Sequence, residues 1–166
     1  MGSALTNTEA VLSRSEPPLT WAKWLRYWSV VIAWMALVSY LSTDAFSAEN
    51  TNRYMDPFLR WVWPGIDTRG LLFLHTVIRK AAHFSEFFVL SLLAFWAFRS
   101  GRSRWSAAWV AKALLLSAIY AGLDETHQAF TYSRTPSPYD SGIDVFGAAA
   151  AQVAIYVRHL VHRAAL

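Results

Sequence analysis

The apolar residues of this chain are collected into runs long enough to cross a bilayer, which limits its fold more than any other feature. These runs cover residues 27–42, 81–98, 105–123 and 143–157, and few ionisable residues interrupt them. A helix rises about 1.5 Å per residue, so about 20 residues cross the roughly 30 Å of hydrocarbon. The chain is therefore predicted to be all-α, an integral membrane bundle of four transmembrane helices.

The composition agrees with a membrane protein. Hydrophobic residues make up 55% of the chain and charged residues only 16%, and nine Trp and ten Phe are present. A soluble domain of this size could not bury so much apolar surface. We expect a flexible tail at residues 1–20 and one transmembrane domain over residues 21–166. The absence of Cys excludes disulfides and thiolate metal ligands.

The segment between the first two predicted helices is polar and rich in aromatic residues. Residues 44–70 are predicted to be a mixed-charge loop that contains Trp61, Trp63 and the Pro64-Gly65 pair. The aromatic part is too short to cross a bilayer, so it is expected to lie in the membrane interface or to cap the bundle. An ordinary aromatic-rich loop fits the pattern equally well.

The positions of Lys and Arg predict how the bundle is oriented, because cytoplasmic loops carry an excess of these residues. Bases precede the first run, separate the second from the third and follow the fourth, so both termini are predicted to be cytoplasmic. Five bases before the second run favour the opposite orientation. The net charge is +4, and the basic residues lie beside the apolar runs. This placement indicates that they set the membrane topology and contact membrane lipids rather than bind nucleic acid.

Helical spacing collects the polar residues of three runs into stripes that can face the interior of the bundle. With both termini cytoplasmic, the stripes meet at the outer membrane face. Ionisable groups within a membrane usually mark a functional site. The members of this candidate site are Lys80, His83, Glu86, Asp124, Glu125, Gln128, Arg134, Asp140 and Asp144.

These residue types are compatible with several kinds of chemistry. Arg79, Lys80 and Arg134 could bind an anionic headgroup. His83 could act as a general base oriented by Glu86, although the sequence places no Ser or Cys nucleophile beside it. The same two residues, with Asp124 or Asp144, could bind a metal, and both metal and cofactor stay open. The charged network could also serve only to hold the helices in register.

Several motifs, in order, resemble the VanZ-like family of bacterial membrane proteins. The family pattern K-x-x-H-F-x-E-[YF] is matched by residues 80–87, and D-E-x-x-Q-x-F by residues 124–130. A third pattern, R-x5-D-x3-[DN]-x2-G, is matched by Arg134, Asp140, Asp144 and Gly147. The chain departs from the family at Tyr132-Ser133, where Pro-Gly is common, and this implies a different turn there.

The resemblance implies a multi-pass protein of the bacterial inner membrane with a role at the cell envelope. The family's namesake is associated with resistance to teicoplanin, a lipoglycopeptide antibiotic. We therefore expect a protein that binds or acts on an anionic envelope lipid or glycolipid and contributes to glycopeptide resistance. The alternatives are a structural accessory protein and a membrane hydrolase or transferase with His83 as its base. A homo-oligomer is compatible with each of these functions.

Overall fold

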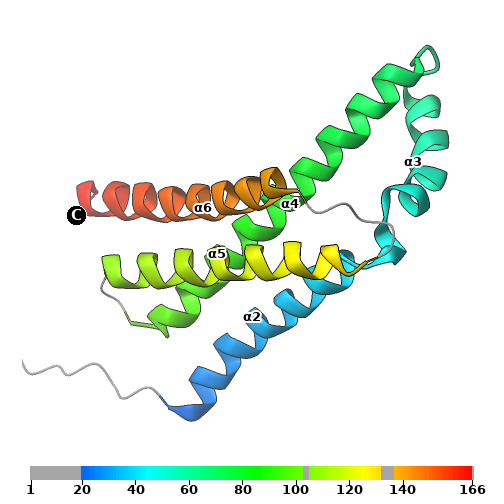
Figure 1. The fold of residues 1–166 in the computed structure, drawn as a ribbon. Coiled ribbons are helices and arrows are strands. Elements are labelled where there is room, and N and C mark those ends of the chain that lie inside the picture. Colours follow the sequence, from blue (N-terminus) through cyan, green and yellow to red (C-terminus); the bar gives the residue numbers. More distant parts are fainter. Residues whose placement is uncertain (1–19, 103–104, 132–136, 166) are drawn as a thin grey trace, which may run out of the picture.

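A computed structural model describes residues 20–102, 105–131 and 137–165, and every regular element in these ranges is helical. The elements are α2 (Trp21–Leu41), η1 (Asp44–Phe46), α3 (Ala48–Val62), α4 (Thr68–Arg99), α5 (Ala107–Ala129) and α6 (Pro138–Ala164). Figure 1 shows α5 and α6 crossing the middle of α4, with α2 running alongside α4. The predicted tail lies almost wholly outside the described residues.

Within the described part of the chain, three helices are long and apolar enough to cross a membrane, as judged by length and composition. They are α2, α4 and α5, and they contain the first three predicted runs except for Ser42, Trp105 and Ser106. The fourth run, residues 143–157, lies within α6, which has 27 residues but does not belong to this set. The all-helical membrane fold is confirmed in this coarser form, whereas the fourth crossing and the orientation of the termini stay predictions.

The predicted loop over residues 44–70 is wrong for its central part, which forms α3. Ser47 caps this helix, because its hydroxyl accepts a hydrogen bond from the amide of Asn50 at 3.4 Å. Phe58 and Trp61 are exposed on α3, and Trp63 is exposed just beyond it. The aromatic segment therefore ends a helix that folds back along the first turns of α4 (Figure 1).

The other helices extend beyond the predicted apolar runs, and this places the polar motifs on helices. Asp67 caps α4 by accepting a hydrogen bond from the amide of Gly70 at 2.8 Å, so α4 begins at Thr68, 13 residues before the apolar run 81–98. At 32 residues α4 is about 48 Å long, well over the roughly 30 Å of hydrocarbon. The added turns of α5 and α6 carry the polar residues that follow residue 123 and precede residue 143.

Small residues allow α6 to pack very closely on α4. A Cβ placed on Gly147 would lie only 2.3 Å from the backbone oxygen of Phe84. Ala148 and Ala151 are buried on the same face of α6. The small residues at positions 147 and 151 predict such a close approach of two helix backbones. This close contact fixes the register of α6 against α4.

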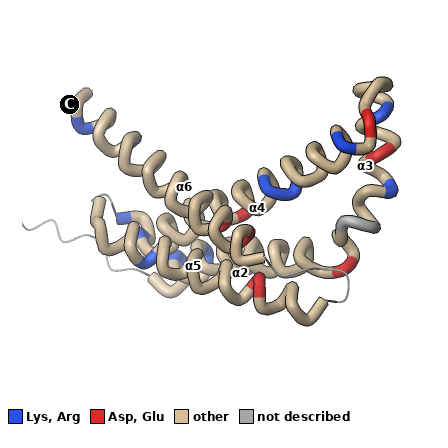
Figure 2. Tube along the Cα trace, turned by 45° about the horizontal axis from the view of Figure 1, so that its top comes forward, with Lys and Arg blue, Asp and Glu red and all other residues tan. Residues whose placement is uncertain are grey.

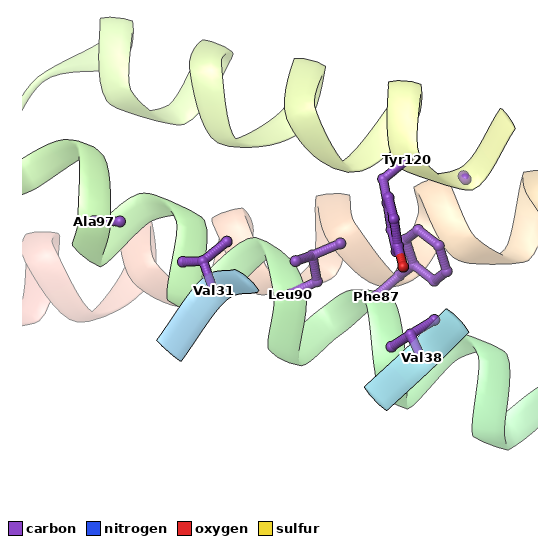
Figure 3. Close-up of a cluster of buried hydrophobic side chains, with 7 residues drawn as sticks. Val31, Val38, Phe87, Leu90, Ala97 and Tyr120 are labelled. Atoms are coloured by element: carbon purple, nitrogen blue, oxygen red, sulfur yellow. The ribbon is translucent and has the colours of Figure 1, made fainter. Parts of the chain in front are cut away.

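A compact apolar cluster joins α2 to the rest of the bundle. Val31 and Val38 of α2 pack with Phe87 and Leu90 of α4 and with Tyr120 of α5, as Figure 3 shows. The Tyr120 hydroxyl hydrogen-bonds to two residues of α2, Ser39 and Met35. This cluster lies directly beside the polar residues of α4 and α5 and holds them in place.

Candidate functional site

The predicted polar stripes of α4, α5 and α6 meet inside the bundle. His83 comes from α4, Asp124 and Gln128 come from α5, and Asp140 and Asp144 come from α6. All five are buried, with between 0% and 6% of their surface exposed. Figure 2 shows acidic residues within the bundle where α6 crosses α4. The structure thus brings together residues that are up to 61 positions apart in the sequence.

The centre of the site is a hydrogen bond between His83 and Asp144. The Nδ1 atom of His83 lies 3.1 Å from Oδ1 of Asp144. Sequence reasoning gave the role of orienting His83 to Glu86, whereas the hydrogen bond that the structure shows for His83 is with Asp144. The two residues meet where Phe84 and Gly147, one and three positions away, bring the backbones of α4 and α6 close together.

Asp124 belongs to the same group. Its Oδ2 atom accepts a hydrogen bond from Nε2 of Gln128 at 2.8 Å, one turn further along α5. A nitrogen of His83 and one carboxylate oxygen from each of Asp124 and Asp144 lie within 4.8 Å of one another. Imidazole nitrogen and carboxylate oxygen are both ligands for divalent metals, so this trio could hold an ion.

Asp140 forms a second, more exposed group with two bases of α4. Its carboxylate accepts hydrogen bonds from Arg79 and from Lys80, both at 3.3 Å. The carboxylate is buried, whereas the side chains of Arg79 and Lys80 are 37% and 43% exposed. One acid is therefore shared by two bases, and the group keeps a net positive charge at the edge of the bundle.

The remaining predicted residues lie around these two groups. Glu125 accepts a hydrogen bond through Oε1 from the backbone amide of Ser137 and so ties the end of α5 to the start of α6. Glu86 lies one turn beyond His83 on α4, and its backbone oxygen accepts a hydrogen bond from the Trp34 indole at 3.0 Å. Arg134 lies outside the described residues.

A cavity of about 470 Å³ opens between α2, α3 and α4. Arg79, His83 and Glu86 of α4 line one wall, and His83 also belongs to the buried trio. The opposite walls come from the end of α2 and from α3. They are mixed in character and include Leu41, Ser42, Asn52 and Met55.

Sequence reasoning missed the contribution of α3 to this cavity. The pairing of His75 on α4 with Asp56 of α3 was not foreseen. Nε2 of His75 lies 2.6 Å from Oδ1 of Asp56, which joins α3 to α4 beside the cavity. Ser47 as a capping residue and the amphipathic pattern after it are the sequence features that indicate a helix here. Pro57 within the segment indicates the opposite, because proline disfavours the interior of a helix.

Comparison with known proteins identifies the family. Neither a search of curated proteins nor a search of solved structures finds a match. A family model described as VanZ/LLP1 matches residues 27–159, which include α4, α5 and most of α2 and α6. The match covers every described residue of the buried site and most of the chain, so this membrane protein belongs to the VanZ/LLP1 family.

Proposed function

We propose that this protein binds the headgroup of an anionic envelope lipid in the cavity between α2, α3 and α4. One observation carries the proposal: Arg79 and His83 lie one turn apart on α4 and line the same cavity, whose other walls include apolar side chains. A guanidinium group pairs well with a phosphate or carboxylate. The cavity volume is within the range of small-molecule sites.

The surroundings of the cavity favour a lipid over a soluble anion. Two of its three helices, α2 and α4, are apolar enough to cross a membrane. Leu41, Met55 and Leu72 give it apolar surface on which the first carbons of an acyl chain could rest. The positive group of Arg79 and Lys80 around Asp140 adds electrostatic attraction for an anionic headgroup.

The proposal includes a topology in which α6 forms the fourth crossing and the site faces the outside of a bacterial inner membrane. Close packing of small residues of α6 on α4 supports this crossing, because such packing is common between membrane helices. Bases before α2, at the end of α4 and at the end of α6 support cytoplasmic placement of those ends. An envelope lipid bound on the outer side would connect the protein with resistance to teicoplanin-type antibiotics.

Lipid retention tests the proposal directly. The full chain is purified from membranes, exchanged into nanodiscs of equal phosphatidylglycerol and phosphatidylcholine, and released for native mass spectrometry. We expect one retained phosphatidylglycerol per chain and severalfold lower retention in Arg79→Gln. The matched control is Arg69→Gln, which changes an exposed base in the first turn of α4. Equal retention of both lipids by the unaltered protein, or full retention by Arg79→Gln, would contradict the proposal.

A hydrolase or transferase that uses His83 as its base is the second candidate. The buried hydrogen bond to Asp144 favours it, because a carboxylate that holds one imidazole nitrogen fixes the tautomer and orientation of the base. The assay is release of glycerol, glycerol phosphate or fatty acid from phosphatidylglycerol vesicles. We expect His83→Gln to abolish turnover and His159→Gln, at the far end of α6, to retain it. Absence of turnover by the unaltered protein would remove this candidate.

A further inference from the structure

The trio of His83, Asp124 and Asp144 has the composition and geometry of a metal site. Each residue comes from a different helix, and all three are at least 95% buried. Nδ1 of His83 and Oδ1 of Asp144 are 3.1 Å apart. Two ligands at right angles around an ion, each about 2.1 Å from it, are separated by about 3.0 Å. The separation fits adjacent ligands of one ion as well as it fits a hydrogen bond.

Unpartnered oxygen atoms provide an independent reason to expect a cation. Within the described part of the chain, Asp124 Oδ1, Asp144 Oδ2 and Gln128 Oε1 are buried without a hydrogen-bond partner. Gln128 has no exposed surface, and its amide nitrogen bonds to Asp124, so its amide oxygen stays beside the trio. Buried polar atoms rarely lack partners in folded proteins. Three buried acceptor atoms on residues of this site, none of them paired with a donor, favour a positively charged ligand.

The balance of charge leads to the same conclusion. With a neutral imidazole, Asp124 and Asp144 place two negative charges in a buried position, and His83 and Gln128 add no charge. The nearest bases of α4, Arg79 and Lys80, are paired with Asp140. Buried charges are costly unless they are paired or coordinate a metal. One divalent cation would make the group neutral.

We propose that His83, Asp124 and Asp144 bind one divalent metal ion, with the amide oxygen of Gln128 as a further ligand. One imidazole nitrogen and two or three oxygens form a ligand set that suits Mn²⁺, Fe²⁺ or Zn²⁺, and the chain has no thiolate to favour softer ions. This ion goes beyond the proposed binding of a lipid and does not depend on it. If both proposals hold, His83 places the ion behind the wall of the lipid cavity.

Binding of Mn²⁺ to the purified full chain, after removal of metals with a chelator, tests this site. We expect one Mn²⁺ per chain, measured by electron paramagnetic resonance, with a nitrogen coupling typical of an imidazole ligand. Asp124→Asn and Asp144→Asn are expected to weaken binding by about tenfold or more. The matched control, Asp56→Asn, alters another acid hydrogen-bonded to a histidine and is expected to keep full affinity.

Two further measurements keep the test decisive if the Asn variants fold poorly. The nitrogen coupling is read in the unaltered protein and requires no variant, and its absence from bound Mn²⁺ would overturn the proposal. Gln128→Glu is expected to tighten binding, because it replaces a neutral oxygen ligand with a charged one. No binding at millimolar Mn²⁺ or Zn²⁺, or equal affinity in a folded Asp144→Asn variant, would likewise overturn it. Arg79→Gln is expected to lose lipid but keep Mn²⁺, so the two proposals can fail separately.

Discussion

Gly147 and Phe84 set the distance between α6 and α4, because a Cβ on Gly147 would lie 2.3 Å from the backbone oxygen of Phe84. Asp144 lies one turn before Gly147, and His83 is next to Phe84, so this contact also sets the separation of the two residues at the centre of the site. The site therefore depends on a residue that has no polar side chain.

Gly147→Ala is expected to separate α4 from α6, because the added methyl group meets backbone rather than a flexible side chain. Overpacking of this kind costs about 1–3 kcal/mol, so the melting temperature and the yield of folded protein should both fall. The control is Gly142→Ala on the same helix, where a Cβ meets nothing within 4 Å. It should be neutral or stabilising by up to about 1 kcal/mol, since Ala favours a helix over Gly. Equal melting temperatures of the two variants would show that the close contact is not important.

Asp140→Asn is expected to increase the binding of anionic lipid. The substitution removes the negative charge that Arg79 and Lys80 share, and it leaves both bases available to a headgroup. Its effect on phosphatidylglycerol retention should be opposite in sign to that of Arg79→Gln. Retention is measured on the monodisperse fraction, so loss of folded protein does not mimic loss of binding. Lower retention by a folded Asp140→Asn variant would show that Asp140 positions the bases for the lipid.

His75→Ala is expected to loosen α3 without unfolding the bundle. Its hydrogen bond to Asp56 is a side-chain link between α3 and α4, and α3 makes few other contacts with α4. Hydrogen–deuterium exchange should become faster in α3 while the exchange of α5 is unchanged. Thr76→Ala is a suitable comparison, since the Thr76 hydroxyl bonds within α4, to the backbone oxygen of Leu72. Unchanged exchange in α3 would indicate that other contacts hold this helix.

The proposed orientation predicts that Ser137 faces the outside of the cell. The chain has no Cys, so single substitutions give unambiguous labelling. Ser137→Cys preserves the backbone amide that bonds to Glu125, and the Ser137 side chain makes no capping hydrogen bond. In intact cells, a membrane-impermeant maleimide should label Ser137→Cys and should label Ser103→Cys only after lysis. The reverse pattern would place the site on the cytoplasmic side.

Much of the site could be predicted from the sequence because its members obey helical spacing. His83, Asp124 and Asp144 lie on the stripes that were expected to face inward, and the structure brings them within 4.8 Å of one another. Helical periodicity identifies a face but not a partner, so the acid that bonds to His83 was assigned to the same helix. Only the register of α4 against α6 shows that Asp144 takes that role.

The wall of the cavity could not be predicted in the same way. Residues 48–62 are polar overall and contain Pro57, two features that are typical of a loop. Their helix is stabilised by tertiary contacts, including the bond between Asp56 and His75 from a different segment. A hydrogen bond between distant segments cannot be predicted from the local amino-acid composition. Residues of α3 and α4 both line the cavity, so its position depends on the tertiary packing of these two helices.

Site-specific photocrosslinking tests the proposed binding of anionic lipid most directly. A benzophenone amino acid is placed at Met55 inside the cavity or, as a control, at Trp61, which is 78% exposed. Both proteins are irradiated in bilayers of mixed phosphatidylglycerol and phosphatidylcholine, and the lipid adducts are identified by mass. We predict adducts enriched in phosphatidylglycerol at Met55, bulk composition at Trp61, and loss of the enrichment when Arg79→Gln is added. Bulk composition at both positions would contradict lipid recognition by this cavity.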